Sequence, residues 1–274
     1  MKRIGIVKGS VVVLLLAGMV TAQNAAAETV LKVGGSGGPL GAARHLAKAY
    51  MKTHKGVTIK VLPSLGSSGG IKAVLGGDLD VAVTGRPLKS EEKAKGAVEK
   101  SYARSPYVFV TNKKVAKKAV TMREVEAYYS GKVRKWPDGS LVRLVVRPES
   151  ESDTKLLRSL SPAMDQAVKA AIARAGSNFA VTDQDSIDMV IKIPGSFGGA
   201  TLTQVLAEKL PVNVLALDGV KPSANGGVRK RYPIWKEFFV VNSQTASAAA
   251  KDFAAFFSSP QAKKILATYG NTPL

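Results

Sequence analysis

The feature that most constrains the fold is a regular alternation of short apolar runs and amphipathic stretches. Short runs at 30–33, 57–62 and 79–84 have the apolar character of strands, and residues 40–54 between the first two have helical spacing. Apolar positions that alternate along the chain are typical of strands, whereas a repeat of three to four residues is typical of helices. The alternation predicts an α/β fold with a mainly parallel sheet and helices on both faces.

The same alternation continues to the end of the chain. Further predicted helices cover 71–75, 90–100, 121–130, 152–160, 164–175, 183–191, 201–210, 246–257 and 260–269, and further strands cover 107–111, 141–146, 212–217 and 238–241. In α/β sheets, ligands bind beyond the carboxyl ends of the strands, where each strand turns into the next helix. The composition of these turns is therefore the best guide to function.

Four of these turns are rich in small or hydroxyl-bearing residues. They occupy 34–38, 66–70, 149–154 and 195–199, and each precedes a predicted helix. The start of a helix offers free backbone N–H groups and the positive end of the helix dipole, and glycine lets a ligand approach them closely. A single turn of this kind is usually a simple helix cap. Four of them in one alternating fold predict an anion site.

Positive charge strengthens the prediction of an anionic ligand. Arg147 directly follows the predicted strand at 141–146, where a guanidinium can bind two oxygens of a tetrahedral anion or form a surface salt bridge. The chain has a formal net charge of +20, and its first 27 residues hold three Lys and Arg and no acidic residue. A field of this sign attracts anions of every kind. Because the basic residues are dispersed, a polyanion binder is only the alternative.

The first 27 residues predict a secretory signal. A positive start with Lys2 and Arg3 is followed by an apolar run at 11–16 and by small residues that end at Ala27. This segment is too short for an ordinary membrane span, although a retained anchor helix is the alternative. The chain has no cysteine and so no site for a disulfide or a lipid anchor of the lipoprotein type. We expect cleavage near Ala27 and a soluble protein in the periplasm.

Residue types that carry common enzyme chemistry are scarce. His45 and His54 are the two histidines, and both lie on or just after the first predicted helix, away from the four turns. The sequence has no metal-ligand cluster, no serine-hydrolase elbow and no phosphate-binding nucleotide motif. We therefore expect no enzymatic activity, no cofactor and no metal.

An ordered series of motifs resembles the phosphate-binding proteins of ABC transporters. The segments that carry the resemblance are 66–70 (GSSGG), 78–88 (DLDVAVTGRPL), 129–136 (YSGKVRKW), Arg147 with 152–154 (SDT), 194–199 (PGSFGG), 218–222 (DGVKP), 232–234 (YPI) and 270–273 (GNTP). They occur in the family's order and span almost the whole chain after residue 27.

The resemblance implies a class II periplasmic-binding-protein fold, in which two α/β lobes are joined by two crossover strands and enclose a ligand cleft. Residues 28–111 and 201–274 would form one lobe, and residues 112–200 the other. The implied function is capture of a small inorganic oxyanion, first of all phosphate, by a monomer that serves an ABC permease in the inner membrane and binds no nucleic acid. The alternatives are sulfate or molybdate as ligand, or a basic secreted protein that binds polyanions or senses phosphate.

The resemblance also implies individual ligand-binding residues. Positions at which the family offers donors are matched by Ser67, Thr84, Arg147, Ser152 and Thr154. The first turn departs from the family, because Gly37 and Gly38 stand where Ser or Thr is usual. Those two positions can still offer backbone N–H groups to a ligand.

A second departure concerns the acceptor that distinguishes phosphate from sulfate. Some phosphate binders place an aspartate directly after the residue that matches Thr84, and it accepts the proton of hydrogen phosphate. This chain has Gly85 there, and it has Asp153 where the family usually has glycine. Asp153 is either a helix cap that faces away from the cleft or a replacement acceptor that acts from the other side of it.

Overall fold

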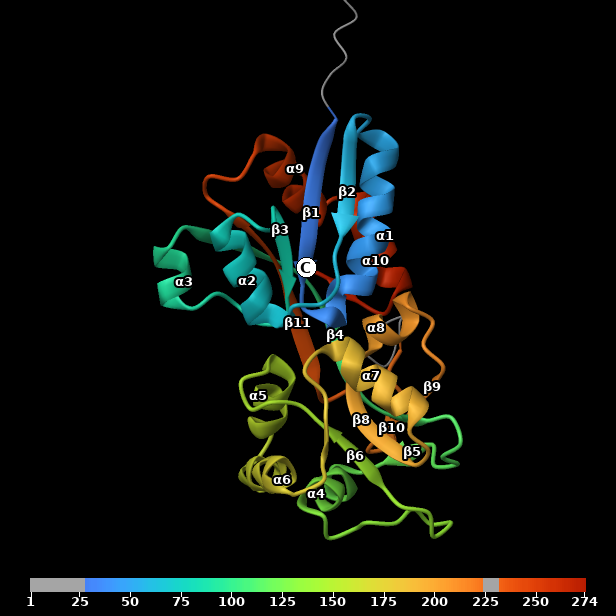
Figure 1. Cartoon of the computed structure of the whole chain (residues 1–274). Coiled ribbons are helices and arrows are strands. Elements are labelled where there is room, and N and C mark those ends of the chain that lie inside the picture. The colour runs from blue at the N-terminus through green and yellow to red at the C-terminus, as the bar shows by residue number, and fades with distance from the viewer. Residues whose placement is uncertain (1–27, 224–231) are drawn as a thin grey trace, which may run out of the picture.

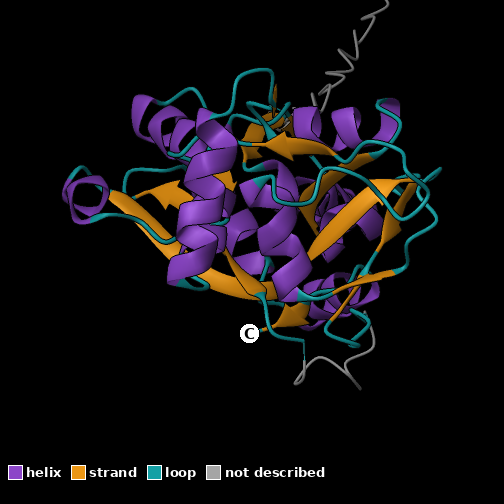
Figure 2. Ribbon diagram, turned by 90° about the horizontal axis from the view of Figure 1, so that it is seen from below, coloured by secondary structure: helices purple, strands orange, loops and turns teal. Residues whose placement is uncertain are grey.

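A computed structural model describes residues 28–223 and 232–274, which form an upper and a lower half in the view of Figure 1. The predicted secretory signal and its cleavage near Ala27 lie outside the described residues. Seen from below, helices lie on both sides of the strands (Figure 2). Within the described part of the chain, no helix combines the length and the apolar character that a membrane crossing requires.

The elements follow the predicted alternation closely. The helices are α1 (Gly37–Thr53), α2 (Gly66–Gly76), α3 (Ser90–Ala94), α4 (Met122–Ser130), α5 (Ser152–Arg158), α6 (Pro162–Ala173), α7 (Asp183–Lys192), α8 (Leu202–Ala207), α9 (Ala248–Phe256) and α10 (Pro260–Thr268). The strands are β1 (Thr29–Gly35), β2 (Val57–Val61), β3 (Val81–Thr84), β4 (Ala97–Asn112), β5 (Ala119–Val120), β6 (Arg143–Val146), β7 (Asn178–Phe179), β8 (Ser196–Thr201), β9 (Val212–Val214), β10 (Ala216–Leu217), β11 (Trp235–Ser243) and β12 (Thr272–Pro273).

Two long strands connect the halves. The main sheet has the order β2-β1-β3-β11-β4-β8-β6-β7. The first part of β4 pairs with β11, and its residues 107–111 pair with β8, in both cases antiparallel. The outer pairs β1–β2, β1–β3, β6–β7 and β6–β8 are parallel. The sheet is therefore mixed, whereas the sequence predicted a mainly parallel one. β4 enters the lower half and β11 returns from it, so these two strands run in opposite directions.

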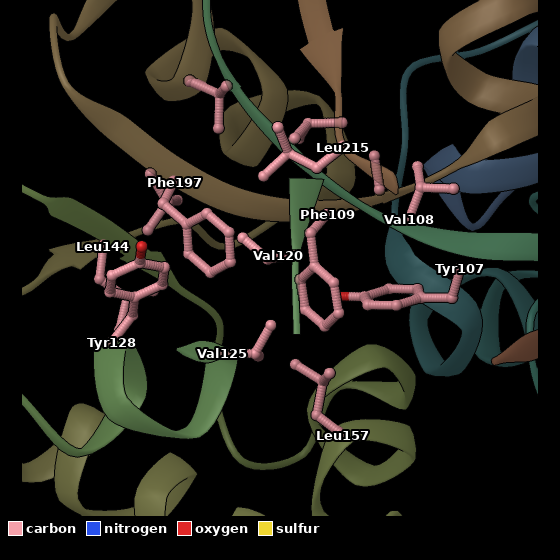
Figure 3. Close-up of a cluster of buried hydrophobic side chains, with 14 of the residues drawn as sticks. Tyr107, Val108, Phe109, Val120, Val125, Tyr128, Leu144, Leu157, Phe197 and Leu215 are labelled. Carbon is pink, nitrogen blue, oxygen red and sulfur yellow. The ribbon is translucent and has the colours of Figure 1, made fainter. Parts of the chain in front are cut away.

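The buried apolar side chains form separate cores in the two halves. The clusters that define the upper half lie within 31–103 and 238–266, and the cluster that defines the lower half lies within 107–234. In the lower core the rings of Phe109 and Phe197 stack with centroids 5.6 Å apart, and Tyr128 packs edge-on against Phe197 (Figure 3). Besides β4 and β11, the halves meet through polar contacts and through the packing of α8 against α1, where a Cβ atom on Gly41 would lie 3.1 Å from the Ala207 Cβ. The lobe boundaries at 111/112 and 200/201 stay predictions.

One predicted helix is shorter than expected, and its second part is a strand. The sequence predicts a charged surface helix at 90–100, but α3 ends at Ala94 and β4 begins at Ala97. Between them Gly96 has φ +89°, a conformation that favours glycine and ends the helix. Of the charged residues that follow, Lys100 and Arg104 are exposed and Glu99 is half-buried, on a strand whose residues 97–106 pair with β11. Tertiary pairing therefore overrides the local helical pattern.

The predicted turns at 66–70 and 195–199 also differ from expectation. Residues 66–70 form the first turns of α2 itself, and β8 begins at Ser196, so that most of the second segment is a strand. Within β8, a Cβ atom on Gly199 would lie 1.8 Å from the Tyr107 hydroxyl oxygen. Glycine at position 199 is required by the close packing of a tyrosine and not by an anion.

Candidate anion-binding cleft

Arg147 lies at the junction of the two halves, directly after β6. Its side chain is only 8% exposed, so its positive charge must be balanced by partners inside the protein. One terminal nitrogen, Nη1, donates to Asp183 Oδ1 at 2.6 Å, and the other, Nη2, donates to Glu151 Oε2 at 2.9 Å. Nη2 also reaches the Val181 carbonyl oxygen at 3.2 Å, while Nε is buried without a hydrogen-bond partner among the described residues. The guanidinium therefore uses both arms of its fork for carboxylates.

Asp183 connects this guanidinium to the upper half. It is the first residue of α7 and is 6% exposed. Its Oδ2 accepts a hydrogen bond from the Gly38 backbone N–H, at 3.2 Å, and another from the Ser36 hydroxyl, at 3.1 Å. Ser36 is the N-cap of α1, so its hydroxyl and the Gly38 N–H belong to the start of that helix. One carboxylate is thus held between a helix N-terminus of the upper half and an arginine of the lower half.

A buried ion pair between Lys236 and Asp153 lies beside this contact. Lys236 belongs to β11, is 3% exposed, and donates to Asp153 Oδ1. Asp153 Oδ2 is also 3.7 Å from Arg147 Nη1, so the aspartate faces into the junction and does not point away from it as a plain helix cap would. Burial, with the nearby charge of Arg147, lowers the pKa of Lys236 to about 7.

Gly85 makes room for this lysine. A Cβ atom on Gly85 would lie 2.3 Å from Cε and 2.9 Å from Nζ of Lys236. A side chain at position 85 would need space that the end of the Lys236 side chain fills. This place in the junction therefore holds a donor, the Lys236 ammonium group, and no acceptor from residue 85.

The predicted ligand-binding residues lie around this junction, although several of their donors are already used. The Thr84 hydroxyl donates to the Arg86 carbonyl at 2.8 Å, and the Thr154 hydroxyl donates to the Arg147 carbonyl at 3.3 Å. The Ser67 hydroxyl accepts from the Gly85 N–H at 3.0 Å. The remaining predicted residues occupy the first turns of α1 and α5: Gly37, Gly38, Ser152 and Asp153. Their role as ligand contacts stays a prediction.

Four residues of the junction were not predicted as ligand contacts: Ser36 and Glu151, which lie in two of the predicted turns, and Asp183 and Lys236, which lie outside them. Asp183 was predicted only as the start of a helix, and its contact with Gly38 joins residues 145 positions apart. The sequence contains a weak indication that Lys236 is buried. It lies in a segment of aromatic and apolar residues that otherwise has the pattern of a buried strand. A lysine at a core-facing position of such a strand indicates a buried partner of opposite charge.

The junction holds more carboxylates than the sequence suggested, because Asp153 was the single acidic candidate. Two basic side chains, Arg147 and Lys236, face three carboxylates, those of Glu151, Asp153 and Asp183. A cavity of about 10 Å³, which is room for about one water molecule, lies beside Arg147 and Asp153, and its other lining residues belong to the lower half. Nevertheless the arrangement holds an anion, because backbone N–H, hydroxyl and guanidinium donors from both halves converge on the Asp183 carboxylate.

A mixed α/β fold with two halves, joined by two long strands and meeting at a set of anion donors, defines the class of periplasmic-binding-protein-like folds. The predicted fold class is thereby confirmed. The chain belongs to the PBP superfamily, since the model of the PBP superfamily domain matches residues 21–261.

Individual relatives agree with this assignment. The chain is 26% identical over 234 residues to the phosphate-binding protein PstS of Bacillus subtilis, over 81% of this chain and 73% of the relative. A phosphate ABC transporter substrate-binding protein with bound phosphate from Clostridium perfringens has the same fold, with a TM-score of 0.75, 21% identity, and coverage of 90% of this chain and all of that one. An ABC-type phosphate transport receptor from Vibrio cholerae matches with a TM-score of 0.59, 18% identity, and coverage of 88% and 99%.

Proposed function

We propose that this chain is a periplasmic solute-binding protein that captures a small inorganic oxyanion, first of all phosphate, for an ABC importer. The observation that carries the proposal is the set of donors around the Asp183 carboxylate. The Gly38 N–H and the Ser36 hydroxyl reach it from the upper half, and Arg147 reaches it from the lower half. Donors of these types bind oxyanions because they offer a helix N-terminus and a two-pronged positive charge.

Phosphate is favoured over other oxyanions by the names of the relatives, which are phosphate-binding and substrate-binding proteins rather than enzymes. Asp153 adds a chemical reason, because it faces the junction and is an acceptor for the proton of hydrogen phosphate. Sulfate, which is fully ionised at neutral pH, has no proton to offer it. Sulfate and molybdate are the alternative ligands if Asp153 stays bound to Lys236.

The proposal includes the route and the partners of the protein. Export would depend on the first 27 residues, and the released chain would act as a monomer in the periplasm, where it delivers its ligand to a permease of the inner membrane. The two lobes would consist of residues 28–111 with 201–274, and of residues 112–200. A chain of this kind needs no cofactor, because capture and release involve no bond making.

Isothermal titration of the protein that starts at residue 28 tests the proposal. We expect saturable binding of one phosphate per chain, in a series with sulfate, molybdate and arsenate. Arg147→Met removes the guanidinium but keeps much of the apolar stem, and should weaken phosphate binding at least about 100-fold, the equivalent of about 2.7 kcal/mol. Arg158→Met is the matched control, because Arg158 pairs with Asp165 and Glu149 outside the junction.

Two results would overturn the proposal. One is an Arg147→Met variant that binds phosphate as tightly as the parent. The other is an absence of saturable binding with all four oxyanions at millimolar concentration.

A further inference from the structure

We propose that Asp183 is an internal competitor of the ligand: its carboxylate occupies the place of the oxyanion, and phosphate binds by displacing it. This inference rests on the proposed function, since it concerns the same junction. It makes Asp183 the residue that sets the affinity of the protein, although the side chain itself would not touch the bound phosphate.

The partners of Asp183 carry the argument. Arg147 and Gly38 were both predicted from the sequence as ligand contacts, and both donate to this carboxylate, at 2.6 Å and 3.2 Å. The Ser36 hydroxyl completes the set at 3.1 Å. A carboxylate presents two oxygens with shared negative charge, as does one edge of a tetrahedral oxyanion. The chain therefore satisfies its own anion donors with an anion of its own.

The second arm of the guanidinium is occupied in the same way. Glu151 accepts from Arg147 Nη2 at 2.9 Å, and its carboxylate lies beside the first residue of α2, 3.5 Å from where a Cβ atom of Gly66 would be. Carboxylates of the lower half thus lie at the starts of α1 and α2 in the upper half. Both helix N-termini that were expected to face a ligand face a side chain of the other half.

The donors are already occupied. Both terminal nitrogens of Arg147 and the Gly38 N–H donate to carboxylates of the chain itself. Phosphate can reach the donors only if Asp183 withdraws. Asp183 is held by its position at the start of α7, where Thr182 and Asp185 form a capping box. Withdrawal therefore needs either a rotation of the Asp183 side chain or a movement of α7 away from α1, and such a movement would separate the two halves.

This arrangement has a conformational consequence. The contacts of Asp183 join the halves, and Gln184 Nε2 adds a long contact to the Gly37 carbonyl at 3.4 Å. A protein that is closed by its own carboxylate must open to admit phosphate and then close again around it. Part of the binding free energy of phosphate is spent on the displacement of Asp183, so the apparent affinity is lower than the donors alone would give.

Asp183→Asn distinguishes this role from that of a ligand contact or a structural residue. The amide keeps the volume and one acceptor oxygen for the Gly38 N–H, but it removes the charge that competes with phosphate for Arg147. We expect the variant to bind phosphate at least tenfold more tightly than the parent in isothermal titration. Asp188→Asn is the matched control, because Asp188 lies on the same helix, is exposed, and pairs with Lys192. It should bind phosphate as the parent does.

Small-angle X-ray scattering of the parent provides a second measurement that needs no variant. We expect the radius of gyration of the phosphate-free parent to match that of the phosphate-saturated protein, because Asp183 already closes the junction. A parent that contracts on addition of phosphate overturns the inference.

The outcomes separate this inference from the proposed function. If the parent binds phosphate and Asp183→Asn binds it equally or more weakly, Asp183 is no competitor, and the proposed function remains. If the parent, Asp183→Asn and Asp188→Asn all fail to bind phosphate while each retains the parent's circular dichroism, both the inference and the proposed function are wrong.

Discussion

Gly85→Ala should disrupt the buried pair between Lys236 and Asp153. The added methyl carbon would lie 2.3 Å from Lys236 Cε, whereas carbon atoms in contact are separated by about 3.5 Å or more. Gly85 has no positive φ, so alanine meets no backbone penalty there, and the lysine must withdraw by about 1 Å. Because both charged groups are buried, loss of the pair costs about 3–5 kcal/mol, and partial relaxation reduces the expected loss to about 3 kcal/mol.

Equilibrium unfolding in urea of four proteins measures this effect. The set comprises the parent, Gly85→Ala, Lys236→Ala and the double variant. Removal of the lysine side chain leaves space for the methyl group, so in the Lys236→Ala background the Gly85→Ala change should alter the free energy of unfolding by less than about 0.5 kcal/mol. The coupling free energy between the two sites should then be about 2–3 kcal/mol. Equal losses in the two backgrounds would refute the reasoning, because the methyl group would then be acting on something other than Lys236.

Two further predictions concern the lysine and the close packing in β8. Because the pKa of Lys236 is lowered to about 7 in the folded protein, the unfolded chain binds more protons above that pH, and the free energy of unfolding should rise by about 2 kcal/mol between pH 7 and pH 9. Urea titrations at pH 7, 8 and 9 should show this rise in the parent and in an exposed control, Lys251→Met, but not in Lys236→Met. If the rise persists in Lys236→Met, the titration of another group causes it. Gly199→Ala places a methyl group 1.8 Å from the Tyr107 hydroxyl oxygen and should cost about 1–3 kcal/mol by overpacking. In Gly139→Ala the added methyl meets nothing within 4 Å but strains a backbone with φ +85°. Thermal unfolding should show a loss in Gly199→Ala that Tyr107→Phe relieves only in part, because the ring carbon Cζ also lies 2.5 Å from the methyl, and a loss in Gly139→Ala that Tyr107→Phe does not change.

Most of the fold could be predicted from the local sequence, because most helices and strands have the apolar periodicity and the end residues that are typical of them. The helix at 122–130, for example, begins after a Thr121 cap with Glu124 three residues on and ends at Gly131, whose φ is +79°. The first half of β4 could not be predicted in this way. Its charged residues have no apolar periodicity of their own, and they become a strand because β11 pairs with them.

The residues of the candidate site also fall into those that a local sequence pattern indicates and those that it does not. Arg147 and the start of α1 could be found from the sequence, because a strand end and a glycine-rich helix start are local features. Asp183 and Lys236 could not, since they act across 145 and 83 positions of the chain on Gly38 and Asp153. A local pattern carries no information about which carboxylate the fold will bring to a helix N-terminus.

The location of a bound oxyanion tests the central claim most directly. A crystal structure of the protein that starts at residue 28, grown with arsenate and measured at the arsenic absorption edge, would place the ion by its anomalous scattering. We predict one peak per chain within hydrogen-bond distance of the Gly38 N–H and the Arg147 guanidinium, with the Asp183 carboxylate moved away from both. A map with no peak between these two groups, and with arsenate only at surface arginines such as Arg134, Arg143 and Arg174, would contradict the account.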